Sequence, residues 1–165
     1  MGRPTLLVNA VELLRQPGAH RHLSVQVDAA EVGVADPAVV GPLDVEVDLD
    51  TTIDDVIVSG TVAVPWRGAC RRCLTPLAEV LRVDVHERYT DGPADDDAFA
   101  IEHGQIDLAA MVREEVLLAL ADERLCRDDC PGLCPRCGHD LAAGPCSCPA
   151  TEVDERWAAL DQLRD

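Results

Sequence analysis

Hydrophobic and polar residues alternate strictly over one stretch in the first third of the chain. From Leu43 to Leu49 the order is Leu, Asp, Val, Glu, Val, Asp, Leu. Successive side chains of a β-strand point to opposite faces of a sheet. This order therefore predicts a half-buried strand with an acidic face in water.

Two further runs have the composition of strands. Residues 56–64 are rich in Val and Ile, and this run is expected to carry a β-bulge at Gly60 and to end at Pro65. Residues 81–85 alternate again. Because the three runs are close in sequence and no helical pattern separates them, we expect antiparallel pairing.

Two helices are predicted from their capping residues. Asn9, followed three residues later by Glu12, can cap a short helix that Pro17 terminates. Asp107 can cap a longer helix, whose apolar residues share one face and are expected to lie across the sheet. They are Leu108, Met111, Val112, Val116, Ala119 and Leu120. The predicted fold class is α+β, an antiparallel sheet with a packed helix.

The composition changes after residue 125 to Cys, Pro, Gly and Asp, with too few apolar residues for a core. We therefore expect an α+β body at 1–125 and a small C-terminal zinc-ribbon-like, metal-binding segment at 126–165. A terminal helix over 154–163 would dock Trp157 and two leucines back on the body.

The charge of the chain limits its partners. All 14 positive charges are arginines and 31 residues are acidic, which gives a formal net charge of −17. Free nucleic acid should be repelled by most of this surface.

No apolar run approaches the roughly 20 residues of a membrane span, and the start lacks a signal-peptide pattern, so we expect a cytoplasmic protein without a membrane partner. Thiols stay reduced in that compartment, so eight cysteines do not by themselves indicate disulfides.

The densest cysteine cluster predicts a metal site. Cys134 and Cys137 form a Cys-x-x-Cys knuckle followed by glycine, and Cys146 with Cys148 can supply two more sulfurs. Four thiolates in tetrahedral geometry are typical of structural zinc, although iron–sulfur coordination uses the same ligands. Because Cys-x-Cys is an unusual second half, Cys130 is an alternative ligand here. His139 is expected not to be a ligand.

The other four cysteines indicate a second site. Cys70 and Cys73 lie in the turn between two predicted strands, and Cys126 and Cys130 follow the long helix. If the end of the helix lies beside that turn, a shared zinc would join the C-terminal segment to the body, which gives one or two zinc ions per chain. The alternative is a redox pair, because nearby arginines would stabilise a Cys70 or Cys73 thiolate.

The same turn carries the densest positive patch. Trp66 could stack on a base, and the arginines beside it could bind phosphate. The candidate RNA-binding residues are Trp66, Arg67, Arg71 and Arg72. The alternative is that Trp66 packs in the core and the arginines pair with the chain's own carboxylates.

Three motifs in the second half of the chain resemble one family. They are the stretch Gly104 to Leu120, the turn Cys70-Arg71-Arg72-Cys73-Leu74-Thr75-Pro76, and the ribbon from Cys130 to Leu141. Together they resemble the YceD family, the large ribosomal RNA subunit accumulation proteins, in the form carried by its actinobacterial members. The resemblance runs from about Trp66 to the C-terminus.

The resemblance implies a ribosome biogenesis factor that supports 23S rRNA processing or accumulation, with no enzymatic step. Its partners would be a large-subunit precursor, 23S rRNA and/or basic ribosomal proteins, without a small-molecule substrate. The alternative function is a cytosolic thiol oxidoreductase that uses Cys70 and Cys73. A zinc hydrolase is less favoured because four cysteines leave no open coordination position.

Overall fold

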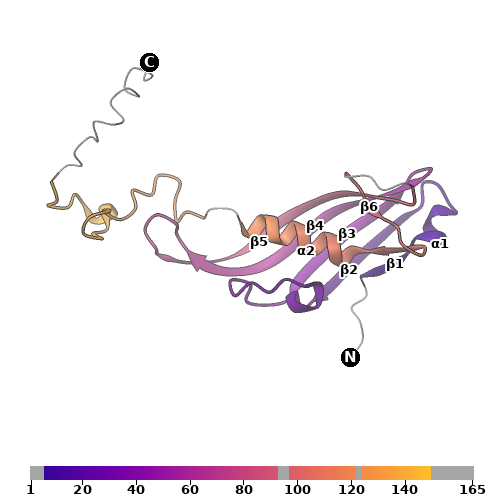
Figure 1. Cartoon of the computed structure of the whole chain (residues 1–165), viewed down its shortest axis with the longest axis horizontal. Helices are drawn as coiled ribbons and strands as arrows, with labels where there is room; N and C mark the ends of the chain where they lie inside the picture. Colours follow the sequence, from indigo (N-terminus) through magenta and orange to yellow (C-terminus); the bar gives the residue numbers. More distant parts are fainter. Residues whose placement is uncertain (1–5, 93–96, 122–123, 150–165) are drawn as a thin grey trace, which may run out of the picture.

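A long, twisted sheet with one helix laid across it forms most of the molecule (Figure 1). The computed structural model describes residues 6–92, 97–121 and 124–149, so the predicted terminal helix at 154–163 lies outside the described residues. The elements are β1 (Leu7–Asn9), α1 (Ala10–Leu14), β2 (His20–Val27), η1 (Ala29–Val32), β3 (Leu43–Thr51), β4 (Asp55–Ala69), β5 (Pro76–Thr90), β6 (Phe99–Ala100), β7 (Gln105–Asp107), α2 (Leu108–Leu120) and η2 (Leu141–Ala143).

The main sheet has five strands in the order β2-β3-β4-β5-β6. Every pair in it is antiparallel except β5 with the two-residue β6. β1 and β7 form a separate two-stranded antiparallel sheet next to the start of α2. The predicted α+β class is therefore confirmed.

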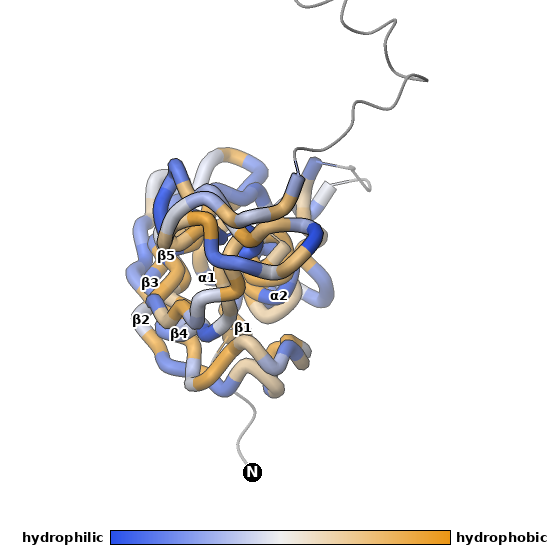
Figure 2. Tube along the Cα trace, turned by 90° about the vertical axis from the view of Figure 1, so that its left-hand side faces the viewer, coloured by the Kyte–Doolittle hydropathy of each residue, from blue (hydrophilic) through white to orange (hydrophobic). Residues whose placement is uncertain are grey.

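The core lies between the main sheet and α2. Along β3 the buried residues alternate with exposed or half-exposed acids, as the sequence predicted, and Leu43 and Leu49 are completely buried. From the helix, Met111, Val112 and Val116 are equally buried and belong to the same cluster. Viewed along the sheet, α2 lies beside the strands (Figure 2).

Both predicted helix caps are present. The side chain of Asn9 accepts a hydrogen bond from the backbone N–H of Glu12 at 3.2 Å, and α1 follows it. The side chain of Asp107 accepts from the N–H of Ala109 at 2.9 Å, and α2 follows it. Each cap satisfies an N–H group that has no partner inside its helix.

The structure corrects two expectations about β4. The strand does not end at Pro65, because β3 has already ended on that side and the ladder with β5 continues to Ala69. On that side the neighbour is the segment 38–40, in which the N–H of Val40 donates to the carbonyl of Pro65 at 2.9 Å, so no hydrogen bond of this pairing uses the missing N–H of the proline. Nor is there a bulge at Gly60, since the pairing with β3 and β5 continues through it without a break. The glycine instead permits close approach, because a Cβ there would overlap the carbonyl oxygen of Glu46.

The hairpin of β4 and β5 reaches beyond the rest of the sheet. Each strand has 15 residues, and their connecting turn lies at one end of the sheet, beyond which the cysteine-rich segment continues (Figure 1). We call residues 66–78 together with 124–149 the distal end.

Among the described residues, none of the helices has both the length and the apolar character that a membrane span requires.

Candidate metal centres

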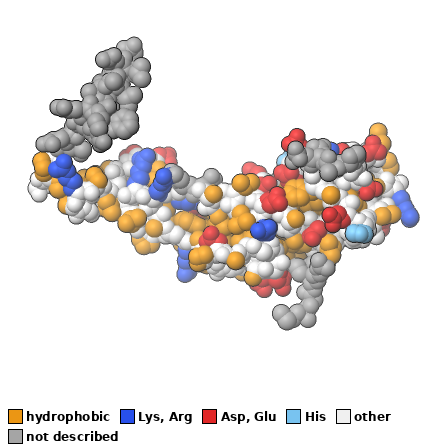
Figure 3. All heavy atoms as spheres, viewed as in Figure 1, with side chains coloured by type: hydrophobic (Ala, Val, Ile, Leu, Met, Phe, Trp, Pro, Cys, Tyr) orange, Lys and Arg blue, Asp and Glu red, His pale blue; other side chains and the backbone are white. Residues whose placement is uncertain are grey.

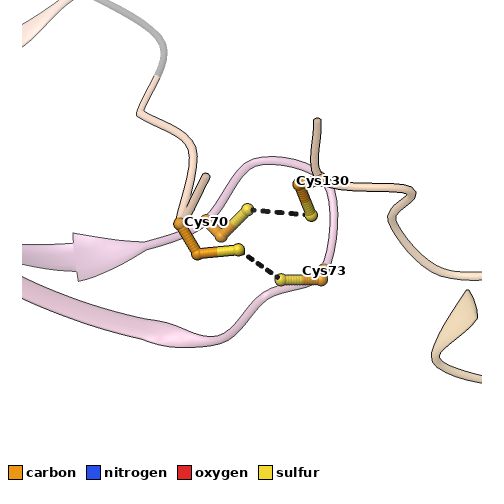
Figure 4. Close-up of side chains that lie close together, drawn as sticks. Cys70, Cys73 and Cys130 are labelled. Atoms are coloured by element: carbon orange, nitrogen blue, oxygen red, sulfur yellow. Dashed lines mark hydrogen bonds between the residues drawn. The ribbon is translucent and has the colours of Figure 1, made fainter. Parts of the chain in front are cut away.

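Four cysteines from two separate segments meet at the hairpin turn. We call Cys70, Cys73, Cys126 and Cys130 the first tetrad; their sulfur atoms all lie within 4.8 Å of one another. The sulfurs of Cys70 and Cys130 are 3.8 Å apart, and those of Cys73 and Cys126 are 3.6 Å apart. Figure 4 shows three of these side chains pointing toward a common centre. The first tetrad therefore joins residues more than 50 positions apart in the sequence.

Backbone hydrogen bonds align the two segments. The N–H of Arg71 donates to the carbonyl of Arg124 at 3.0 Å, and the N–H of Leu133 donates to the carbonyl of Arg72 at 3.1 Å. The guanidinium of Arg72 also donates to the carbonyl of Cys130 at 3.0 Å. These bonds place the C-terminal segment against the turn in the register that brings the four sulfurs together.

The second tetrad is local. Cys134, Cys137, Cys146 and Cys148 also have their sulfurs within 4.8 Å of one another, and those of Cys134 and Cys146 are 3.4 Å apart. All eight cysteines are free thiols. The structure places Cys130 in the first tetrad, and His139, which is exposed, contributes no atom to the second.

The thiols of the first tetrad differ in acidity. Burial acts to raise the pKa of Cys70, but hydrogen bonds from the backbone N–H groups of Cys73 and Cys126 outweigh it and lower the pKa to about 6. Conversely, the neighbouring sulfurs of Cys130 and Cys73 raise the pKa of Cys126 to about 12. One thiolate is stabilised while its neighbour keeps its proton, as expected when like charges crowd into one space.

The second tetrad repeats this division. Backbone N–H groups of Cys137 and Arg136 lower the pKa of Cys134 to about 6. The sulfur of Cys137 is the main cause that raises the pKa of Cys148 to about 12. A bound dication would displace the remaining protons, because metal ligands of this type bind as thiolates.

The donor sets fit a tetrahedral metal. With metal–sulfur bonds of about 2.3 Å, the sulfurs of a tetrahedral site are about 3.8 Å apart. The three sulfur–sulfur pairs given above lie at 3.4, 3.6 and 3.8 Å, far beyond the length of a disulfide bond. Both cysteine tetrads could therefore bind a metal ion, and a site with four thiolates has no open position for a substrate.

The predicted RNA-binding residues lie in two environments. The side chain of Trp66 is buried, with the guanidinium of Arg124 5.6 Å from the ring centroid. This position agrees with the alternative that the indole packs in the core. Arg67, Arg71 and Arg72 are exposed.

Sequence reasoning missed the role of Arg124. Its Nη2 donates to the carbonyl of Ala119 at 2.7 Å, near the end of α2, and its Nε lies 3.2 Å from a carboxylate oxygen of Glu79 on β5. It thereby connects the helix end, the hairpin and the indole of Trp66. Its position between the helix and the cysteines was the only signal, and it did not specify these partners.

Thr75 was also missed. Its hydroxyl oxygen lies 3.1 Å from the sulfur of Cys73, and this contact is the main cause that lowers the pKa of that thiol. In the sequence only its position two residues after Cys73 could have pointed to this contact.

Several known proteins are similar to this chain. It is 34% identical to an uncharacterized protein of Mycobacterium tuberculosis over 96% of this chain and 81% of that protein. It is 29% identical to the uncharacterized protein YlbN of Bacillus subtilis, over 66% of this chain and 64% of that one. The chloroplastic large ribosomal RNA subunit accumulation protein YCED homolog 1 of Arabidopsis thaliana is 31% identical over 41% of this chain and 21% of its own length. No solved structure matches at a significant level.

The family comparison covers both tetrads. The family described as large ribosomal RNA subunit accumulation protein YceD matches residues 58–164, which include all eight cysteines and α2. The match extends over more than half of the chain. The chain therefore belongs to the YceD family, as its motifs indicated.

Proposed function

We propose that this protein is a non-catalytic factor in biogenesis of the large ribosomal subunit, supporting processing or accumulation of 23S rRNA. The family name supports the process, and the first tetrad supports the manner of action. A site that joins two distant segments through four sulfurs builds a rigid surface, and it leaves no coordination position for chemistry. The protein would act in the cytoplasm by binding a large-subunit precursor.

Both tetrads are proposed to hold zinc, with all eight cysteines as ligands. Zinc takes four thiolates at closed structural sites, and a segment with little apolar burial is typical of sequences that fold only with metal. Iron would give the same ligand count but a coloured protein. Elemental analysis distinguishes the two metals.

The distal end is the proposed contact for RNA. It carries three aspartates and six arginines, the arginines being Arg67, Arg71, Arg72, Arg124, Arg127 and Arg136. Two zinc tetrathiolates would add a formal charge of about −2 each, so this end would be close to neutral. The rest of the chain has eight arginines against 28 acidic residues. RNA would therefore be repelled least at the distal end, where Figure 3 shows blue side chains gathered.

The acidic remainder suits a different class of partner. Red side chains spread over the part of Figure 3 that holds the sheet and α2. Basic ribosomal proteins would be attracted to such a surface. We therefore propose contact with precursor RNA at one end of the molecule and with basic proteins along the other.

The thiol oxidoreductase alternative finds no support in the geometry. An attacking sulfur must be reachable by its substrate. Cys70 is 0% exposed; Cys73 is half-buried, but both share their site with two further thiols. A lowered pKa alone is also what a metal ligand has, so it does not favour redox catalysis.

The proposal is tested by isolating the tagged full-length chain from its own cells and sequencing the RNA that co-sediments with it. We expect enrichment of large-subunit precursors containing 23S rRNA. The double variant Arg67→Ala and Arg136→Ala should lower this enrichment. The matched control, Arg21→Ala with Arg82→Ala, removes the same charge from the body and should not. Absence of ribosomal RNA from the wild-type sample would refute the proposal.

A further inference from the structure

The first Cys-x-x-Cys turn is closed by two backbone hydrogen bonds. The N–H of Cys70 donates to the carbonyl of Thr75 at 2.8 Å, and the N–H of Leu74 donates to the carbonyl of Cys70 at 2.9 Å. These bonds make the residue after Cys73 turn sharply. Leu74 adopts a φ of +61°, in the left-handed region.

The second Cys-x-x-Cys turn has the same pair of bonds. The N–H of Cys134 donates to the carbonyl of His139 at 2.8 Å, and the N–H of Gly138 donates to the carbonyl of Cys134 at 2.9 Å. Gly138 has a φ of +72° and takes the place that Leu74 takes in the first turn. One backbone geometry is thus occupied by glycine at one site and by leucine at the other.

Leucine is the unexpected residue at this position. Glycine adopts a positive φ without a steric penalty, whereas a residue with a Cβ is strained there. Burial of the side chain does not offset this strain, because Leu74 is 64% exposed. The leucine is therefore strained and also exposes an apolar side chain to water. Strain of this kind is found where a side chain has a task outside its own fold.

The surroundings of Leu74 indicate what it contacts. It lies at the tip of the β4–β5 hairpin, next in sequence to the metal-ligand candidate Cys73 and close to the exposed Arg71 and Arg72. Residues 66–78 contain no acidic side chain. An apolar tip among guanidinium groups complements RNA, in which unstacked bases lie close to phosphates. A basic protein surface would be repelled by the same arginines.

We propose that Leu74 is a recognition residue that packs against an unstacked base of large-subunit rRNA while the arginines beside it bind the phosphates. This inference rests on the proposed function and deepens it. The rigid turn holds the leucine in place, so its side chain reaches RNA without a further loss of freedom on binding.

The variant Leu74→Gly separates recognition from structure. Glycine fits the left-handed backbone, so the thermal midpoint should stay the same or rise and the metal content should be unchanged. Binding to in-vitro transcribed 23S rRNA fragments should become about three- to tenfold weaker, as expected for the loss of one apolar contact. Leu74→Asn, which also tolerates this backbone, should weaken binding in the same way.

The matched control is Ile53→Gly, which removes an 82% exposed apolar side chain from the turn between β3 and β4. It should not change binding. Equal affinity of wild type and Leu74→Gly for a fragment would overturn the inference and leave the proposed function intact. Failure of the wild type to bind any 23S fragment would count against RNA contact itself. Loss of binding to precursor particles but not to naked RNA would mean that Leu74 contacts a protein, which also overturns the inference.

Discussion

The body and the segment 124–149 differ in what they bury. The core of the body is one continuous cluster of Val, Leu, Ile and a few larger side chains contributed by the strands, α1 and α2. In the segment 124–149 the buried residues are Cys130, Gly132 and Cys134. Two of these three are ligand candidates. Hydrophobic burial is spread over many contacts, whereas metal coordination concentrates the stability in a few bonds. Loss of one residue should therefore have graded effects in the body and an all-or-none effect in the segment.

The sharpest test of this contrast is to break the first tetrad. After removal of metal with a strong chelator, residues 124–149 should lose their amide protection while β3 and β4 keep theirs. Cys130→Ser leaves the second tetrad complete and should release residues 124–133 alone. Structural zinc contributes apparent free energies of about 10–16 kcal/mol in small zinc-binding peptides, so the effect on this segment should be complete. Hydrogen exchange read by mass spectrometry measures both regions at once.

The control for this change is Ser147→Ala, which alters a residue between two ligand candidates without removing a sulfur. It should leave the exchange pattern unchanged. Continued protection of 124–149 in metal-free protein would contradict the contrast, and so would melting of the whole body.

The opposite test weakens the core of the body. Met111 is 0% exposed, so Met111→Ala leaves a cavity and should lower the free energy of unfolding of the body by about 2–5 kcal/mol. The bound metal should not change. Urea denaturation followed by circular dichroism gives the first quantity and elemental analysis the second. In Leu118→Ala, on the exposed face of the same helix, the change should stay within about 0.5 kcal/mol. Loss of metal from Met111→Ala would show that the two regions are not independent.

The two regions can also be compared by the stability that is lost when a glycine with positive φ is replaced by alanine. A Cβ at Gly60 would overlap the backbone of β3, so Gly60→Ala should destabilise the body by about 2 kcal/mol or more. A Cβ at Gly138 would meet nothing within 4 Å, so Gly138→Ala should cost only the backbone strain of about 1 kcal/mol. Thermal unfolding of both variants tests the order, and the reverse order would mean that packing does not distinguish the regions.

The smallest expected effect is electrostatic and lies on the exposed surface of the body. The carboxylate of Asp50 accepts a hydrogen bond from Nδ1 of His20 at 2.9 Å, and this bond raises the pKa of His20 above 6.5. Because the folded-state pKa is raised, the contribution to stability is present below pH 6.5 and is lost as the pH rises through the folded pKa. Asp50→Asn should lower the pKa of His20 in an NMR titration, and should reduce stability slightly near pH 5.5 but not near pH 8. An unchanged pKa of His20 in Asp50→Asn would show that Asp50 does not raise it.

Much of the body could be predicted from local chemistry. The alternation in residues 43–49 and the capping side chains of Asn9 and Asp107 each act within a few residues, so the sequence contains them directly. β2 was not predicted, because its first residues, His20 to His22, are all exposed at the edge of the sheet and show no alternation. The continuation of β4 through Pro65 depends on where β3 ends, which is a tertiary fact.

For the candidate site, spacing suggested the pairs of cysteines but not their distances. A knuckle such as Cys134 to Cys137 is local, whereas the approach of Cys126 to Cys73 depends on how α2 packs on the sheet. The roles of the sulfurs as ligands and the division of the chain at residue 125 stay predictions. The first tetrad draws from both sides of that division, so it would be the link between the two parts.

The central claim is that bound metal holds the segment 124–149 in place. The most direct test is elemental analysis of protein purified natively without added metal, together with titration of its free thiols and hydrogen exchange on the same sample. Because there are two tetrads, the account predicts about two zinc ions per chain, no reactive thiol and protected amides in residues 124–149. Protein that contains neither zinc nor iron yet keeps those amides protected would contradict it.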